Sequence, residues 1–418
     1  MNNSKKFLPG LFLVLIIVFL ILGAILYLAA YFWGFFLILL AGILYFIRQV
    51  ITLGPAEAKL NVKLMGKKLM VPVVGILCSM ILAILIMIIT GYDPLTVLKS
   101  LFYGGFIRNW HVSVLNATPL IFTGLSIAIG FKAGLFNIGA EGQYYIGTMA
   151  ATYLGLKLGL PPFLSIVLIY LISASAAAAY NIFPAVLKVK TGAHEVITTM
   201  MFAHIARYLS PIFVLANGGD PATSTHVYVT DEIIRTNFLP YFSSFLPEAN
   251  YRLHIGILIA LITAVAINFF LNRSKYGYEI RAVGANADAA RAQGISVGRN
   301  IILALVMGGF LAGMAGVTET LGLNHKMFQN LDAGYGFNGI SVALLAGNHP
   351  IGIIFTSLLW GALDAGGQYM SRTTGVPGAI VEIIKGMILF LIVAKYIYSW
   401  AGNRLVSRRK ARAEEGLA

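Results

Sequence analysis

The stretch NRSKYGYEIRAVGANADAARAQGISVGRN, residues 272–300, is a charged island rich in alanine between two long apolar runs. A membrane protein needs only a few polar residues to turn between two spans. A basic loop of this length, built from helix-forming residues, predicts a surface on which a cytoplasmic protein docks. The other long polar stretch, 217–251, has fewer charges and more Pro, Gly and Thr, which is typical of an extracytoplasmic connection.

The composition around this island is that of a membrane protein. Apolar residues make up 58% of the 418 residues and charged residues 11%, whereas soluble domains have about 45–50% and about 25%. The apolar runs are continuous rather than alternating, which favours helices over a barrel. The sequence therefore predicts an all-α integral membrane protein, since only helices and closed barrels can span a bilayer.

The apolar runs are numerous enough for a multi-pass protein, given that a crossing helix needs about 20 residues. We count twelve segments: 8–29, 31–49, 70–91, 115–132, 137–156, 161–187, 195–216, 252–271, 300–322, 338–347, 350–369 and 376–396. The segment 338–347 is too short to cross alone. We expect it to be a half-length helix that continues as irregular backbone inside the protein.

Lys and Arg set the orientation, because cytoplasmic loops carry an excess of both. The amino end, the link after the first two spans, the island and the tail are all basic. This pattern predicts that both termini are cytoplasmic. It also accounts for the formal net charge of +14, so we expect membrane lipid around the chain and no nucleic acid partner.

Four parts follow from this count. Residues 1–50 form an N-terminal transmembrane hairpin and residues 51–69 a basic cytoplasmic linker. Residues 70–396 form the core, which contains the polar loop 273–299. Residues 397–418 form a basic cytoplasmic tail.

The core contains a hidden duplication, with five segments on each side of the loop 217–251. In each half a Gly-rich break that contains Asn joins the second segment to the third: KAGLFNIGAEGQ at 132–143 and DAGYGFNGISVALLAG at 332–347. We match Phe136–Gly139 with Phe337–Ile340. One break faces the cytoplasm and the other faces outward, as an inverted repeat requires.

Broken helices at matching places point to a transport path, and ionisable residues at membrane depth are functional hypotheses. The candidates for the translocation path are Asn137, Glu141, Gln143 and Asn338. Two alternatives stay open. These residues could instead brace the break, and Glu141 could simply stabilise a helix amino end, where a carboxylate is favoured.

Signatures of chemistry are missing from the sequence. There is no Gly-rich phosphate loop of the G-x-x-x-x-G-K-[ST] type, the seven His are scattered without metal-ligand spacing, and no nucleophile motif is present. We expect no catalytic residue, metal site or cofactor in this chain. If transport uses ATP, a partner ATPase subunit binds the ATP and Mg²⁺.

Four stretches carry a resemblance to a known family: GLFNIGAEGQ (134–143), YGYEIRAVGANADAARAQGI (276–295), GYGFNGISVALLAGNHP (334–350) and GVPGAIVEIIKG (375–386). With them, the chain resembles permease subunits of bacterial ABC importers. The group is the branched-chain amino acid/simple sugar permease family, in its nucleoside-uptake branch. The resemblance covers roughly residues 70 to 400, as these stretches are spaced, and leaves out the hairpin 1–50.

The resemblance implies a type II ABC importer permease core of about ten helices in the bacterial cell (inner) membrane. It implies three partners: a second permease subunit, a cytoplasmic ATP-binding subunit and an extracytoplasmic substrate-binding lipoprotein. Glu279–Ile295 would be a coupling helix seated on the ATPase. Its contacts would come from Glu279, Arg281, Asp288 and Arg291.

We therefore expect a permease that moves a small molecule, a nucleoside, inward by alternating access. Two alternatives differ in solute or energy source. The first is an ABC permease for simple sugars or branched-chain amino acids. The second is an ion-coupled secondary transporter in which Glu141, Glu195 or Asp364 carries the ion. A membrane-embedded enzyme is disfavoured by the missing catalytic motifs.

Overall fold

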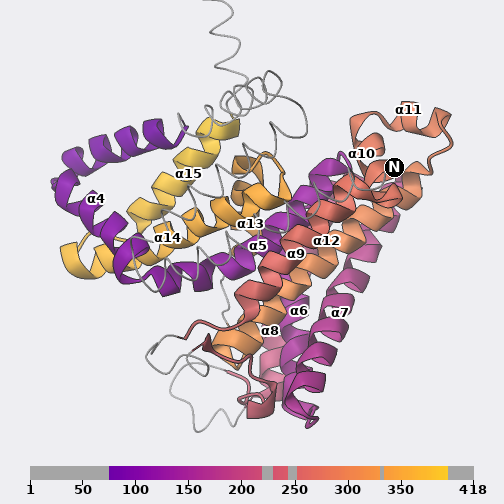
Figure 1. Ribbon diagram of the computed structural model, residues 1–418, viewed down its shortest axis with the longest axis horizontal. Helices are drawn as coiled ribbons and strands as arrows, with labels where there is room; N and C mark the ends of the chain where they lie inside the picture. Colours follow the sequence, from indigo (N-terminus) through magenta and orange to yellow (C-terminus); the bar gives the residue numbers. More distant parts are fainter. Residues whose placement is uncertain (1–74, 219–228, 243–251, 330–333, 394–418) are drawn as a thin grey trace, which may run out of the picture. The chain divides into compact units, whose positions relative to one another are not determined.

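The computed structural model describes residues 75–218, 229–242, 252–329 and 334–393 (Figure 1). The predicted hairpin 1–50, linker 51–69 and tail 397–418 lie outside the described residues. The chain divides into two units after Cys78, and all contacts discussed below lie within the unit that begins at Ser79.

Helices build nearly all of the described chain. A first helix covers Gly75–Ile89. The labelled helices are α4 (Pro94–Phe102), α5 (Trp110–Lys132), α6 (Ala140–Lys157), α7 (Pro162–Thr191), α8 (Glu195–Asn217), α9 (Gly256–Arg273), α10 (Lys275–Ala285), α11 (Ala287–Ala292), α12 (Val297–Glu319), α13 (Tyr335–Leu345), α14 (Pro350–Thr374) and α15 (Ala379–Val393). Two π-helical turns, η1 (Tyr103–Arg108) and η4 (Thr320–Asn324), and a 3₁₀ turn, η2 (Arg235–Asn237), complete them. Among the described residues, β-pairing is limited to isolated bridges.

Six of these helices are long and apolar enough to cross a membrane: α5, α7, α8, α9, α12 with its π-helical end, and α14. They coincide with six of the predicted spans. The predicted short segment is also present, because α13 covers only Tyr335–Leu345. The multi-pass, all-α architecture is thus confirmed, while the count of twelve spans stays a prediction.

Proline and glycine set the ends of several spans. α14 begins with Pro350, whose fixed φ suits the first helical position, and ends at Gly375 with φ +70°. α7 has the same arrangement, from Pro162 to Gly192 with φ +71°. Residues that are hard to place inside a helix are thus used to start and stop it.

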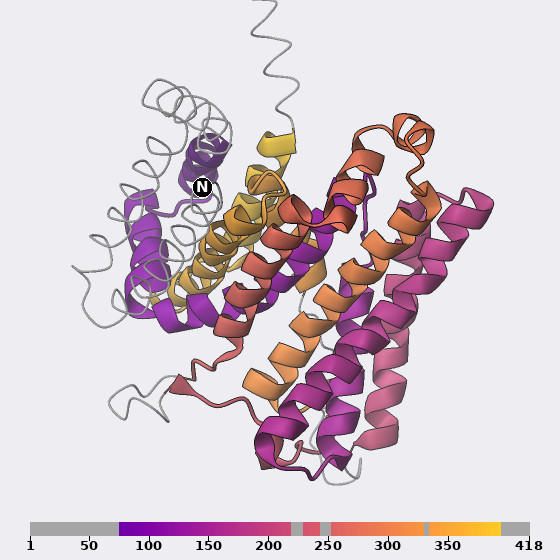
Figure 2. The same cartoon turned by 45° about the vertical axis from the view of Figure 1, so that its right-hand side comes forward.

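The helices of the two halves interlock in exchanged pairs. α5 of the first half packs against α14 of the second, and α12 of the second half packs against α7 of the first. In the same way α6 packs on α12, whereas α13 packs on α5. Figures 1 and 2 show α6, α7 and α8 gathered on one side and α13, α14 and α15 on the other. Two related halves that wrapped around a common axis would show such an exchange of partners, and the duplication itself stays a prediction.

The register of the predicted duplication is wrong in detail. Phe136–Gly139 lies in the irregular segment before α6, but Phe337–Ile340 lies inside α13. Matching the two helix starts, Ala140 and Tyr335, instead places Gln143 opposite Asn338, one turn into each helix. The two stretches have similar residues because an irregular break and the start of a helix can both contain Gly, Asn and Phe.

Glycines allow the long helices to approach closely. A Cβ on Gly313 of α12 would lie 2.6 Å from the Ala177 side chain of α7. A Cβ on Gly361 of α14 would lie 2.2 Å from the Ser113 carbonyl oxygen of α5. Small residues at such crossings are typical of membrane helices, which pack by close van der Waals contact.

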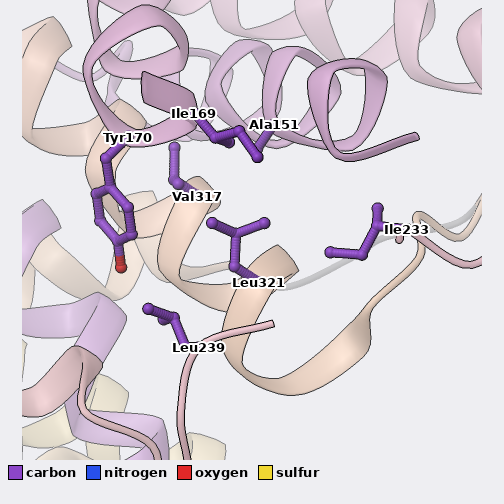
Figure 3. Close-up of a cluster of buried hydrophobic side chains, with 7 residues drawn as sticks. All are labelled: Ala151, Ile169, Tyr170, Ile233, Leu239, Val317 and Leu321. Carbon is purple, nitrogen blue, oxygen red and sulfur yellow. The ribbon is translucent and has the colours of Figure 1, made fainter. Parts of the chain in front are cut away.

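The connection between the halves is anchored at one end of the bundle. Ile233 and Leu239 enter a buried cluster with Ala151, Ile169, Tyr170, Val317 and Leu321 (Figure 3). The Asn237 amide donates to the carbonyl oxygens of Gly155 and Leu158, at 2.9 and 3.0 Å. These contacts fix the described part of the connection, 229–242, over the ends of α6 and α12.

Candidate functional site

The break before α6 is held by a pair of amides. Asn137 donates to Gln143 and accepts from it, both at 3.1 Å, and the Asn137 side-chain oxygen also accepts from the Gly139 backbone N–H at 3.1 Å. Both side chains are buried. Buried amides with matched partners stabilise one geometry, so these two residues brace the break.

Glu141 joins the two halves. It lies buried in the first turn of α6, and its carboxylate accepts from the backbone N–H groups of Gly334 and Gly336, at 3.2 and 2.6 Å. Those groups belong to the start of α13, which has no other side-chain cap. The carboxylate therefore faces two helix amino ends, each with a partial positive charge.

A cavity of about 550 Å³ lies between α5, α13, α14 and α15. Polar and charged side chains dominate its wall. The lining residues are Asn116, Tyr335, Asn338, Asp364, Gly367, Gln368, Ser371, Arg372, Gly378, Val381, Glu382 and Lys385. Its volume falls in the range of about 300–1,000 Å³ typical of small-molecule sites.

An ion triad forms one side of this cavity. The Lys385 Nζ lies 2.5 Å from Asp364 Oδ1 and 2.8 Å from Glu382 Oε1. The Lys385 side chain is 4% exposed and that of Asp364 is 24% exposed. Glu382 and Lys385 lie one helical turn apart on α15, whereas the pair of Asp364 and Lys385 joins α14 to α15. The sequence did not predict this second pair.

Several other groups in the cavity wall have no hydrogen-bond partner among the described residues. They are the side chains of Asn116, Gln368 and Ser371. A polar group at membrane depth that lacks a protein partner must meet water or a solute. The cavity is therefore a place where a polar molecule can replace water.

Aromatic rings lie against two of the residues that line the cavity. Tyr335 packs on Tyr144, with 5.7 Å between ring centroids, and Trp360 Nε1 donates to Asn338 Oδ1 at 3.3 Å. This bond leaves the Asn338 amide nitrogen for another partner. The wall thus combines the ring of Tyr335 with the amides of Asn116, Asn338 and Gln368, which suits a planar polar solute.

The predicted path residues separate into two groups. Asn338 lines the cavity, whereas Asn137, Glu141 and Gln143 are absent from its wall and hold the breaks together. Asp364, Gln368, Glu382 and Lys385 are polar residues in predicted apolar spans, and nothing in the sequence shows that they converge. Their spacing places Asp364 and Gln368 on one face of a helix, and Glu382 and Lys385 on one face of another, but no sequence signal shows that these two faces meet.

The polar island differs from the single helix expected over Glu279–Ile295. It forms two helices, α10 and α11, because Asn286 starts a new one: its side chain accepts from the Asp288 and Ala289 backbone N–H groups at 3.0 and 2.9 Å. Asn strongly favours this capping position. A continuous coupling helix was therefore the wrong prediction.

The four residues expected on the coupling surface are not equally exposed. Asp288 and Arg291 pair at 3.2 Å at the tip, with side chains 90% and 69% exposed. Glu279 is turned inward, 16% exposed, and accepts from the Asn300 amide at 3.1 Å. Arg281 is partly covered, and its Nε has no hydrogen-bond partner among the described residues.

The island also touches the first break. A Cβ on Gly284 of α10 would lie 2.2 Å from the Lys132 carbonyl oxygen and 2.7 Å from the Gly134 nitrogen. Gly134, with φ +74°, is the turn that leads from α5 into the break. A force on α10 would thus reach the Asn137 segment directly.

Comparison with known proteins agrees with this architecture. The family described as "Branched-chain amino acid transport system / permease component" matches residues 112–393. The chain is 33% identical to a guanosine ABC transporter permease protein of Bacillus subtilis over 340 residues, which are 81% of this chain and 96% of that protein. It is also 33% identical to a nucleoside ABC transporter permease protein of Lactococcus lactis over 344 residues, 79% of this chain and 92% of that one.

A third relative, a glucose ABC transporter permease protein of Haloferax volcanii, is 29% identical over 348 residues, 81% of this chain and 90% of that protein. No solved structure matches the chain. The resemblance seen in the sequence motifs is confirmed, and the matches extend over most of both partners. The chain therefore belongs to the family of branched-chain amino acid transport system permease components, which are membrane transport subunits and not enzymes.

Proposed function

We propose that this chain is the transmembrane permease of an ATP-driven importer that moves nucleosides into the cell. The cavity between α5, α13, α14 and α15 is its solute site. ATP is bound and hydrolysed by a separate subunit, and the helices expose the cavity alternately to the two sides of the membrane. The observation that carries the proposal is the cavity wall, which is polar and balanced in charge.

The balance of charge favours a neutral solute. Asp364 and Glu382 face Lys385 and Arg372 across the same wall, so the two signs cancel. A nucleotide or an amino acid would bring charge into a site whose own charges already balance, at a cost in desolvation. Guanosine and glucose, which name the solutes of two relatives, are neutral and carry hydroxyl groups on adjacent carbons.

The energy would enter through the island 273–299. Asp288 and Arg291 at its tip would contact the ATP-binding subunit. Glu279, which accepts from Asn300 of α12, and Arg281 would hold the island to the ends of α9 and α12. Support comes from the contact of Gly284 with the backbone at Lys132 and Gly134. Docking of the island would thus be felt at the break before α6 without any long relay.

The remaining partners and the orientation belong to the same proposal. The island and both termini are cytoplasmic, as the excess of Lys and Arg there favours. The connection 217–251 then faces outward, where an extracytoplasmic binding lipoprotein delivers the solute. A second permease subunit completes the membrane pair. The interlocked pairs of α5 with α14 and α12 with α7 support the inverted repeat.

Reconstitution tests the function. Proteoliposomes would hold the complete transporter, with ATP in the lumen on the ATPase side and the binding protein with labelled guanosine on the other. We expect guanosine to accumulate only with ATP and to do so equally in the presence of an uncoupler. Uptake that survives without ATP but collapses with the uncoupler would instead establish an ion-coupled transporter. Preferential accumulation of labelled glucose would establish a sugar permease.

A further inference from the structure

We propose that Asp364 is the specificity residue of this permease: held by Lys385, its carboxylate recognises two adjacent hydroxyl groups of the solute in the cavity. The proposal rests on the nucleoside transport proposed above and adds the chemical group that is read. For a nucleoside, that group is the 2′,3′-diol of the ribose.

One oxygen of this carboxylate is used and the other is open. Asp364 Oδ1 accepts from the Lys385 ammonium at 2.5 Å. Asp364 Oδ2 accepts from no residue that the structure describes, and the residue lines the cavity. The carboxylate is therefore fixed through one oxygen and presents the other to whatever fills the cavity.

The chemistry of a carboxylate selects the group that it can bind. An ionised carboxylate only accepts hydrogen bonds, whereas the amides of Asn116, Asn338 and Gln368 both donate and accept. The edges of a nucleobase mix donors and acceptors and match the amides. Two neighbouring hydroxyls supply two donors side by side, and the open Oδ2 of Asp364 has two lone pairs with which to accept both. Dinucleotide-binding folds use an acidic residue for the same ribose hydroxyls.

Lys385 acts as a positioning residue. Its ammonium is buried between the carboxylates of Asp364 and Glu382, which lie on different helices. The second carboxylate keeps Lys385 paired if Asp364 loses its charge. Replacing Asp364 by Asn therefore leaves a neutral pair of Lys385 and Glu382, and the variant should still assemble.

The wild-type transporter gives the first test. Uptake of guanosine and of 2′,3′-dideoxyguanosine by the complete transporter is compared with the affinity of the isolated binding protein for the same two compounds. We expect the transporter to prefer guanosine by roughly tenfold more than the binding protein does, because a charge-assisted hydrogen bond is lost with the diol. Equal preferences would overturn the proposal without requiring any variant to fold.

Asp364→Asn gives the second test, with Glu382→Gln as its matched control on the same lysine. We expect Asp364→Asn to lower kcat/KM for guanosine about tenfold while uptake of the dideoxy analogue changes little. Glu382→Gln, also in the cavity wall, should change the uptake of guanosine and of the dideoxy analogue by the same factor, so that the ratio of the two stays that of the wild type. ATPase co-purification measures assembly for both variants.

The outcomes separate the two proposals. If Asp364→Asn lowered the uptake of both solutes by the same factor, the role of Asp364 would be structural. This result would overturn the recognition of the diol, although nucleoside transport would stand. A loss of preference in Glu382→Gln but not in Asp364→Asn would assign the wrong carboxylate and would also overturn it. Failure of the wild type to take up any nucleoside would refute the proposed function itself.

Discussion

Glu141 of α6 and Gly336 of α13 are nearly two hundred residues apart in the chain, yet the carboxylate of the first accepts the backbone N–H of the second at 2.6 Å. The two backbones also lie close together, since a Cβ added to Gly336 would lie only 2.2 Å from the Glu141 backbone nitrogen. Two broken segments, one from each half, thus meet start to start. If the halves are related by an inverted repeat, this is the place where the axis between them passes.

Glu141→Ala removes the acceptor from two backbone N–H groups at the start of α13. One of them, that of Gly336, is buried, and a buried donor without a partner costs about 1–3 kcal/mol. We expect a clear drop in the melting temperature of the purified transporter and a loss of most solute uptake. Glu141→Gln keeps one acceptor oxygen but loses the charge, so its melting temperature should lie between the two. Wild-type stability in Glu141→Ala would show that the contact is incidental.

Gly336→Ala tests the closeness of the two backbones. The added Cβ would meet the backbone of Glu141 and Ala140, which cannot move as a side-chain tip could. We expect the variant either to fail to assemble or to lose about 2 kcal/mol or more of its free energy of unfolding, by analogy with overpacked cores. Gly386→Ala in α15 is the control, because no residue in the described part of the chain lies within 4 Å of its Cβ. Equal behaviour of the two variants in a thermal unfolding assay would contradict the packing described here.

The tip of the island can be tested by exchanging its charges. In the double variant Asp288→Arg with Arg291→Asp, the pair within α11 can still form, but the pattern presented outward is reversed. We expect the ATP-binding subunit to co-purify about fivefold less or worse, because misplaced charges at an interface oppose binding. Undiminished capture of the ATPase would mean that the tip is simply a solvated turn.

A histidine in the connection before α9 predicts a dependence of stability on pH. Burial, with a smaller contribution from nearby His325, lowers the pKa of His254 from 6.5 to about 4. The unfolded chain therefore binds a proton more readily than the folded one, so stability is full above about pH 6.5 and declines as the pH falls towards 4. By pH 5 the loss should be about 2 kcal/mol.

His254→Asn is the matched variant for this test. The His254 Nδ1 accepts from the Gly256 backbone N–H at 3.1 Å, and an Asn side-chain oxygen can take the same place. We expect the melting temperature of the wild type to fall further between pH 7 and pH 5 than that of His254→Asn. Parallel curves for the two proteins would show that His254 carries no such penalty.

Much of the fold followed from the sequence because bilayer thickness imposes long apolar helices. α8 lies within one residue of the predicted 195–216, and the end of α5 and the start of α14 fall on the predicted limits. α5 begins five residues before its predicted span, and α14 ends five residues after its own. The half-length helix at Tyr335–Leu345 could also be predicted, since its apolar run is short and flanked by Gly. These features depend on local composition, which a single sequence carries.

The features that could not be predicted from the sequence depend on contacts between residues or on a single capping side chain. The pairing of Asp364 with Lys385 joins two helices and has no spacing signature. The division of the island at Asn286 depends on one capping side chain within an otherwise helical stretch. The role of Glu141 as a cap for α13 was foreshadowed only in part: the sequence placed it at a helix amino end, but not at the amino end of a second helix.

The central claim is that the cavity beside Asn338 lies on the path of the solute. Cys78 is the single cysteine, so Asn338→Cys in a Cys78→Ala background places one thiol in the cavity wall. The rate at which a membrane-impermeant thiol reagent labels the complete transporter is then measured with and without saturating guanosine. The account predicts labelling that guanosine slows severalfold. A thiol that reacts at the same rate with and without guanosine, in a variant that still transports it, would contradict the account.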